Sequence, residues 1–205
     1  SLHRRFLALW QRSLSSASGS AHDVLEILHD CYSEAHRRYH GIGHIQSCLE
    51  QLDLAVGGMQ QPDEVELAIW FHDAVHRPGN ADNEAESAAL FRRLAGDQEA
   101  ARVDRVCHMI LDTTHDHPPV SKDGNYMVDI DLASLGQPWA RFSSDSELIR
   151  AEQPELSDAA YAIALQRFLQ ALIGRPSIYR SSLFRMLYEQ SARANIERVL
   201  GPVHT

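Results

Sequence analysis

The sequence predicts an all-α protein, a single compact helical bundle. Apolar residues recur at the i, i+3, i+4 spacing of amphipathic helices along most of the 205 residues, and the alternating pattern of strands is nearly absent. Hydrophobic residues make up 44% of the chain, which is enough for a sizeable core in one domain of this length. We therefore expect one domain over residues 1–205. In it, the N-terminal helix with its Ser-rich loop (1–20) and the C-terminal helices (137–205) pack on a helical core.

The expected helices follow one another with short breaks. They cover residues 2–10, 21–39, 45–56, 62–75, 82–94, 97–114, 127–135, 138–150, 157–173 and 181–200. The Ser-rich stretch 13–20 ends the first helix, and Gly41 and Gly43 interrupt the second. Pro62 suits the first turn of a helix, where its missing N–H removes no hydrogen bond, and Gly201-Pro202 stops the last helix.

Charge and cysteine content exclude several classes of protein. The 28 acidic residues outnumber the 19 Lys and Arg, giving a net charge of −9 that disfavours binding to duplex nucleic acid. Apolar runs are only a few residues long, so we expect no membrane span. The three Cys form no CxxC pair, which favours a protein of the reducing cytoplasm.

Twelve His are present, and those suited to chemistry gather in four motifs. The motifs are His40-x-x-x-His44, His72-Asp73 with His76, Thr114-His115, and Asp129-Ile130-Asp131. Imidazole and carboxylate together form the ligand set of a borderline or hard divalent ion. A carboxylate at the end of an apolar helix is also costly to bury unless a positive charge such as a metal neutralises it. Each motif alone fits a structural role, whereas the four together in this order favour a metal site.

The order of these motifs resembles the HD superfamily of metal-dependent phosphohydrolases. The likeness to a bacterial branch of predicted phosphohydrolases rests on residues 36–40 with His44-Ile45, 70–75, 82–84 with Ser87, Thr114-His115, 129–136, Ile178-Tyr179 and 192–195. It extends over nearly the whole chain and implies a bundle of helices around a metal. Ala164-Leu165 departs from that branch, which has Gly-Arg there.

Two motifs are also similar to those of the cyclic-nucleotide phosphodiesterases, although Gly41 replaces their Asn. That similarity makes His40 the proton donor and His44 a metal ligand, whereas the bare superfamily pattern also allows His40 as the ligand. Asp131 is preferred to Asp129 as the last ligand. The resemblance thus implies a site with the metal ligands His44, His72, Asp73 and Asp131, the catalytic residues His40, Asp73 and Glu84, and the substrate-binding residues Arg37, His76, Asn83 and His115. Arg38 is an alternative to Arg37 as a phosphate contact.

The function implied is hydrolysis of a phosphoester or phosphoanhydride bond in a nucleotide or related phosphorylated small molecule. One divalent ion (Mn, Fe, Ni, Zn or Mg) would serve as cofactor, with a second ion and a homodimer left open. One alternative is a di-iron oxygenase of the same superfamily, with further ligands from His76, His115 and His108. Another is a non-catalytic module that binds a nucleotide and regulates a partner. A zinc peptidase is a weaker alternative, because the His72-x-x-x-His76 spacing carries Asp73 in place of the usual Glu.

Overall fold

The computed structural model describes residues 1–14, 19–96 and 100–201, and every regular element in these residues is helical. The α-helices are α1 (Leu2–Ser13), α2 (Ala21–Tyr32), α3 (Ile42–Ala55), α4 (Pro62–Phe71), α5 (Asn83–Ala95), α6 (Ala100–Asp112), α7 (Lys122–Asp131), α8 (Trp139–Ala151), α9 (Asp158–Ile173) and α10 (Ser182–Leu200). Short 3-10 helices, η1 (Val56–Gly58) and η2 (Leu132–Gly136), follow α3 and α7. The all-α prediction is therefore confirmed for the described part of the chain.

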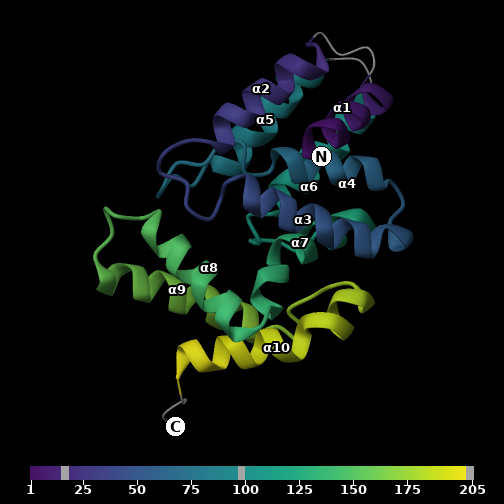
Figure 1. Cartoon of the computed structure of the whole chain (residues 1–205). Coiled ribbons are helices and arrows are strands. Elements are labelled where there is room, and N and C mark those ends of the chain that lie inside the picture. The colour runs from purple at the N-terminus through teal and green to yellow at the C-terminus, as the bar shows by residue number, and fades with distance from the viewer. Residues whose placement is uncertain (15–18, 97–99, 202–205) are drawn as a thin grey trace.

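The helices are arranged with α4 at the centre (Figure 1). Helices α1, α2 and α5 lie at the N-terminal end of the molecule, and α8, α9 and α10 lie at the opposite end. Helix α4 packs against α1, α3, α6 and α7, while α10 packs on η2. All residues from Glu64 to Phe71 of α4 are buried, so the chain emerges from this helix in the interior of the protein.

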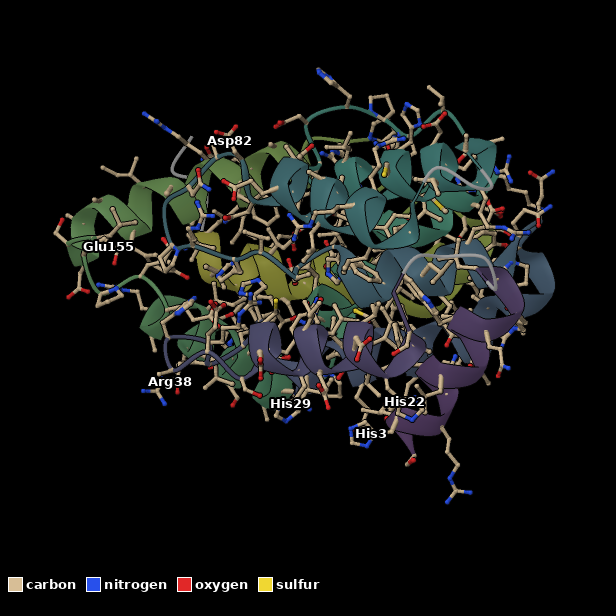
Figure 2. All side chains as sticks on the ribbon, turned by 90° about the horizontal axis from the view of Figure 1, so that it is seen from above. His3, His22, His29, Arg38, Asp82 and Glu155 are labelled. Carbon is tan, nitrogen blue, oxygen red and sulfur yellow. The ribbon has the colours of Figure 1, made fainter. Side chains whose placement is uncertain are left out.

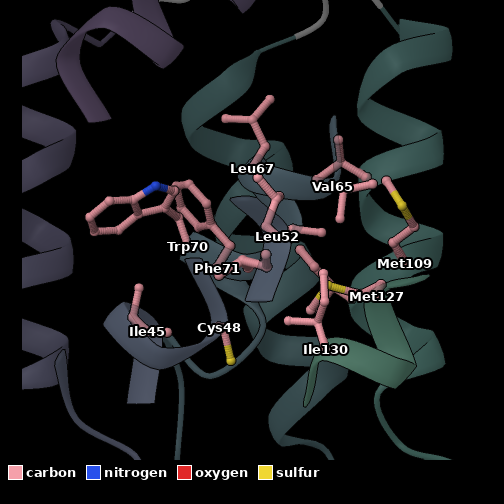
Figure 3. Close-up of a cluster of buried hydrophobic side chains, with 14 of the residues drawn as sticks. Ile45, Cys48, Leu52, Val65, Leu67, Trp70, Phe71, Met109, Met127 and Ile130 are labelled. Carbon is pink, nitrogen blue, oxygen red and sulfur yellow. The ribbon is translucent and has the colours of Figure 1, made fainter. Parts of the chain in front are cut away.

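One continuous cluster of buried apolar side chains extends from Phe6 in α1 to Ile196 in α10. Trp70 and Phe71 lie in the part of this core shown in Figure 3, and Phe6 packs edge-on against Trp70 with ring centroids 5.1 Å apart. Burying an aromatic or aliphatic side chain of this size contributes about 1.5–3 kcal/mol. The same apolar contacts therefore hold the N-terminal and C-terminal helices to the centre.

Several predicted helices end earlier than their apolar pattern suggested: α6 ends at Asp112 and α7 at Asp131, short of residues 114 and 135, and the ends of α2 and α4 shape the site. Helix α2 ends at Tyr32 and not near Tyr39, and residues 33–41 form an irregular segment before α3. Helix α4 ends at Phe71 and not at Val75, because the chain turns at residues 72–74. Side chains from distant elements bind the backbone of both segments and replace the hydrogen bonds that a longer helix would have made.

Helix α7 begins at Lys122, five residues before the predicted start at Met127. Ser121 caps it by accepting a hydrogen bond from the N–H of Gly124. A Cβ at Gly124 would lie 2.5 Å from a carboxylate oxygen of Asp112, so only glycine fits where α7 crosses the end of α6. Gly124 is thus needed for the packing of α7 against α6.

Several sequence features lie at the surface or outside the described residues. His3, His22 and His29 point outward from the molecule (Figure 2). The Ser-rich residues 15–18, the expected helix start at Asp97, and Pro202 with His204 lie outside the described residues. No helix in the described part combines the length and apolarity needed to cross a membrane.

Candidate metal centre

Four of the predicted ligands meet where three helices begin or end. His44 lies in the first turn of α3, His72 and Asp73 follow α4, and Asp131 is the last residue of α7. His72 Nε2 lies 3.2 Å from His44 Nε2, 3.1 Å from Asp73 Oδ2 and 3.5 Å from Asp131 Oδ1. His44 Nε2 lies 3.5 Å from Asp73 Oδ2 and 3.3 Å from Asp131 Oδ1. The two imidazoles therefore lie against each other, and each of them also contacts both carboxylates.

These separations suit metal ligation. Ligands about 2.1 Å from one ion and at tetrahedral or right angles to one another lie about 3.0–3.4 Å apart. Asp73 Oδ2 is buried, and its near neighbours are the Nε2 atoms of His72 and His44, at 3.1 and 3.5 Å. A buried carboxylate needs a positive partner, which protonated imidazole or a bound cation would supply. The donor set thus fits a divalent ion, and His44, His72 and Asp131 alone already form a group able to hold one.

The neighbours of the ligands fix how these side chains present their atoms. His72 donates from Nδ1 to the carbonyl of Ile69 at 2.9 Å, which leaves Nε2 to face the other ligands. His115 Nε2 donates to Asp131 Oδ2 at 2.8 Å, which leaves Oδ1 facing the two imidazoles. His115 itself has φ of 59°, in the left-handed region, so its backbone is strained to make this contact. His115 therefore orients a ligand, whereas the sequence had assigned it to substrate binding.

The opposite charges of the carboxylates and imidazoles in this cluster shift the pKa values of Asp131 and His72. Burial alone would raise the pKa of Asp131, but the hydrogen bond from His115 and the contacts with His44 and His72 bring it well below its usual value. Burial would lower the pKa of His72, and the charges and hydrogen bonds of Asp73 and Asp131 together outweigh that effect and raise it. The metal-free cluster thus holds ionised carboxylates beside protonated imidazole. A divalent ion would displace the proton from Nε2 of His72.

Asp129, the alternative to Asp131, has a different task. Its side chain is fully buried, and its two carboxylate oxygens accept the N–H groups of Arg180 and Ser181, both at 2.7 Å. These bonds tie the end of α7 to the start of α10. Asp129 is therefore a structural residue outside the ligand cluster.

A second group of ionisable side chains lies beside the first and contains a residue that the sequence analysis missed. Glu152, which follows α8, is only 1% exposed. Its Oε1 accepts the backbone N–H groups of Arg38, Tyr39 and His40 at 2.6, 2.7 and 2.9 Å. Its Oε2 accepts a short hydrogen bond from His40 Nδ1 and lies 3.3 Å from His76 Nε2. Glu152 thereby holds the irregular segment and both imidazoles at once.

His40, His76 and Glu152 form the second group able to hold a metal ion. The rings of His40 and His76 are stacked, with centroids 4.2 Å apart and planes inclined at 28°. An ion bound to both rings would have to lie in both ring planes, which is difficult for a stacked pair. Burial would raise the pKa of Glu152, but the hydrogen bonds from His40 and His76 lower it far below its usual value. This geometry favours a hydrogen-bonded carboxylate clamp over a metal site.

Of the remaining predicted residues, Glu84 lies near the ligand cluster and Asn83 holds a loop. Burial, and then the charges of Asp73 and Asp131, raise the pKa of Glu84 at the start of α5, so this carboxyl group lies within range of the ligand cluster. Asn83 instead closes the loop after His76, exchanging hydrogen bonds with the N–H and carbonyl groups of Arg77 at 2.9 and 3.0 Å. Its assignment to substrate binding is therefore not supported.

Arg37 is also a structural residue. It is 8% exposed, and its guanidinium donates to the carbonyls of His40, Asp73 and Ala74 at 2.9, 2.6 and 3.0 Å. The Arg37 guanidinium is therefore bonded to the backbone of both irregular segments. This arrangement does not fit the predicted contact with substrate. The alternative, Arg38, lines a cavity of about 260 Å³ that His44 and Asp131 also line. Polar side chains from α3, η2 and the residue after it complete the wall, among them Ser47, Gln51, Ser134 and Gln137.

The residues proposed as ligands of a second iron, or of the zinc of a peptidase, do not lie together in the structure. His108 donates from Nδ1 to a backbone carbonyl within α6 at 2.7 Å, His76 lies at Glu152, and His115 lies at Asp131. The His72-x-x-x-His76 pair does not share a helix, because α4 ends at Phe71. In comparisons with known proteins, no family model, curated protein or solved structure matches the chain.

Proposed function

We propose that this protein is a metal-dependent phosphohydrolase. Its ion would be held by His44, His72, Asp73 and Asp131, and its substrate would be a phosphorylated small molecule such as a nucleotide. The observation that carries the proposal is that two neighbouring imidazoles, His44 and His72, each lie within 3.5 Å of both the Asp73 and the Asp131 carboxylate. The motif order that resembles the HD superfamily supports the same conclusion.

The chemistry divides between the ion and the side chains around it. A divalent ion at such a site lowers the pKa of a bound water to about 7 and neutralises charge on a phosphoryl group. His40 faces the ligand cluster from the neighbouring clamp, with its ring 5.9 Å from that of His44, and would donate a proton to the leaving oxygen. Glu84, whose pKa is raised by burial and by the nearby carboxylates, would orient and deprotonate the attacking water.

The cavity beside the ligands would hold the rest of the substrate. Arg38 would pair with an anionic group there, and the amide and hydroxyl side chains would bind sugar or base polar groups. Cys48 and Ile130 supply apolar surface in the same cavity.

The test compares two matched double variants. His72→Ala/Asp73→Ala removes two ligands, and His29→Ala/Asp30→Ala removes the same pair of residues from the exposed surface of α2. Metal content by mass spectrometry, on proteins purified without chelator, should be near one equivalent in the wild type and the surface variant and near zero in the ligand variant. A screen of phosphate esters with that metal should give hydrolysis only by the first two. Equal, negligible metal in all three after incubation with Mn, Fe, Ni, Zn and Mg would refute the proposal.

A second candidate, the di-iron oxygenase, is favoured by one observation, the second ligand group of His40, His76 and Glu152. It requires two equivalents of redox-active iron in the same measurement and the loss of one equivalent on Glu152→Ala. The stacking of the two imidazoles argues against it.

A further inference from the structure

A cleft of about 520 Å³ lies on the other side of Asp131 from the cavity described above. It is formed by the loop after α6, by Asn125 of α7 and by the segment that joins α9 to α10. The basic side chains lining it are His115, His117, Arg175, Arg180 and Arg185, and Asp116 is the one acidic residue that lines it among those described. In a chain with a net charge of −9, a cleft lined by three arginines is an unusual concentration of positive charge.

These arginines form no ion pair with a described residue, although the charge of Arg180 partly offsets the burial that raises the pKa of Asp112 and of Asp129. Most arginines of the protein are in ion pairs, for example Arg5, Arg12, Arg141 and Arg193, but Arg175, Arg180 and Arg185 make none with any described residue. Burial and the charge of Arg180 lower the pKa of Arg175. Like charges crowded in a partly buried cleft destabilise the unliganded protein, and a bound anion would relieve that repulsion.

The cleft is connected to the metal centre through one residue. His115 lines the cleft, holds Asp131 through its ring, and accepts a hydrogen bond from Arg175 on its carbonyl at 3.1 Å. An occupant of the cleft would therefore lie one side chain away from a metal ligand.

We propose that this cleft binds a phosphate-bearing anion through Arg175, Arg180 and Arg185. Guanidinium groups match the oxygens of a phosphate with paired, charge-assisted hydrogen bonds, which makes them the preferred side chains for this ligand. The phosphate has two sources: the distal group of a substrate bound at the metal centre, or a separate phosphorylated molecule. The site does not depend on whether the metal centre is catalytic.

The experiment measures pyrophosphate binding by calorimetry to the purified full chain with its metal. Arg175→Gln/Arg180→Gln should weaken binding by about tenfold or more, because the variant loses two guanidinium groups that donate charge-assisted hydrogen bonds to the anion. Arg93→Gln, an exposed arginine near the end of α5, is the control with the same type of charge change. Arg180→Gln alone, which keeps the bond from Arg175 to His115, separates loss of binding from loss of folding. Circular dichroism checks the fold of each variant.

The ligand variant His72→Ala/Asp73→Ala distinguishes the two sources. If it binds pyrophosphate as the wild type does while the double arginine variant does not, the cleft is a separate site. If both variants weaken binding, one anion spans the cleft and the metal centre, and the cleft serves the substrate. Wild-type affinity in the double arginine variant, or an equal loss in Arg93→Gln, would overturn the proposal. A protein without metal or hydrolytic activity would refute the proposed function and leave this test unchanged.

Discussion

Replacing Glu152 with Gln tests how the candidate proton donor is held. In the wild type, Oε1 accepts three backbone N–H groups and Oε2 accepts the Nδ1–H of His40. The amide oxygen of Gln can replace Oε1, and its NH2 group then faces His40 and His76. Because NH2 cannot accept a hydrogen bond, His40 would lose its Nδ1 proton and keep a proton only on Nε2. His40 would then be neutral and a poor proton donor.

The expected magnitudes follow from the bonds that are changed. The loss of the charge-assisted bonds on Oε2 should lower the free energy of unfolding by about 2 kcal/mol, since hydrogen bonds to charged groups contribute about 1.5–3 kcal/mol each. Turnover should fall about 10²–10⁴-fold, the usual contribution of a positioned acid or of the carboxylate that holds it. Metal content should stay at the wild-type level, because the four ligands are intact.

The assay combines three measurements on Glu152→Gln and on Glu147→Gln, an exposed residue of the same helix. Proton–nitrogen NMR of the imidazoles reports whether Nδ1 of His40 bears a proton, urea unfolding reports stability, and phosphate release reports turnover. A retained Nδ1 proton with turnover within twofold of wild type would refute the role of Glu152. A loss of turnover in Glu147→Gln as well would point to a general effect of the helix.

Three further predictions concern residues around the ligands. The folded pKa of Glu84 is raised, so its ionised form destabilises the fold above the unfolded pKa of about 4.3. Glu84→Gln should therefore raise the melting temperature of the metal-free protein at pH 7, with the gain vanishing below pH 4, and should lower turnover; a lower melting temperature at pH 7 would contradict this. Asp129→Ala should lower the free energy of unfolding in urea by about 2–4 kcal/mol and leave the metal content unchanged. Asp131→Ala should instead abolish the metal content measured by mass spectrometry. The reverse pattern would mean that Asp129 is the ligand and Asp131 the structural residue. Arg37→Ala should cost about 3 kcal/mol by leaving buried carbonyls unpaired, and an unchanged unfolding curve would show that water replaces it.

The sequence predicted the fold class because burial of apolar residues has a period that can be counted. The resemblance to the HD superfamily implied His44, His72, Asp73 and Asp131 as metal ligands, and the His-Asp pair after Phe71 is also conspicuous because it follows an apolar helix. The choice between Asp129 and Asp131 could not be made from spacing. The two carboxylates lie two residues apart near the same helix end, and only the position of the α10 N-terminus separates them.

The roles of Glu152 and Arg37, which hold the backbone around the site, could not be predicted from the sequence because their partners are distant in the chain. Glu152 ends a helix in a polar stretch and looks like an exposed residue, yet it binds backbone atoms more than 110 residues earlier. Arg37 looks like a phosphate contact, yet its partners are carbonyl groups that become available only because α4 stops at Phe71. A hydrogen bond from a side chain to a distant backbone group does not require particular residue types nearby, so no sequence motif marks it.

The positions of Arg37 and Glu152 explain how two irregular segments can hold the side chains of the candidate site in fixed positions. Residues 33–41 and 72–76 lack the repeating bonds of a helix, so their backbone groups need other partners to stay ordered. Arg37 donates hydrogen bonds to carbonyl groups of both segments, and Glu152 accepts hydrogen bonds from N–H groups of the first segment. The segments are therefore fixed by two buried charges of opposite sign, one from within the site and one from α8. It follows that α8 and the helices after it contribute to the geometry of the site although none of the four ligands lies in them.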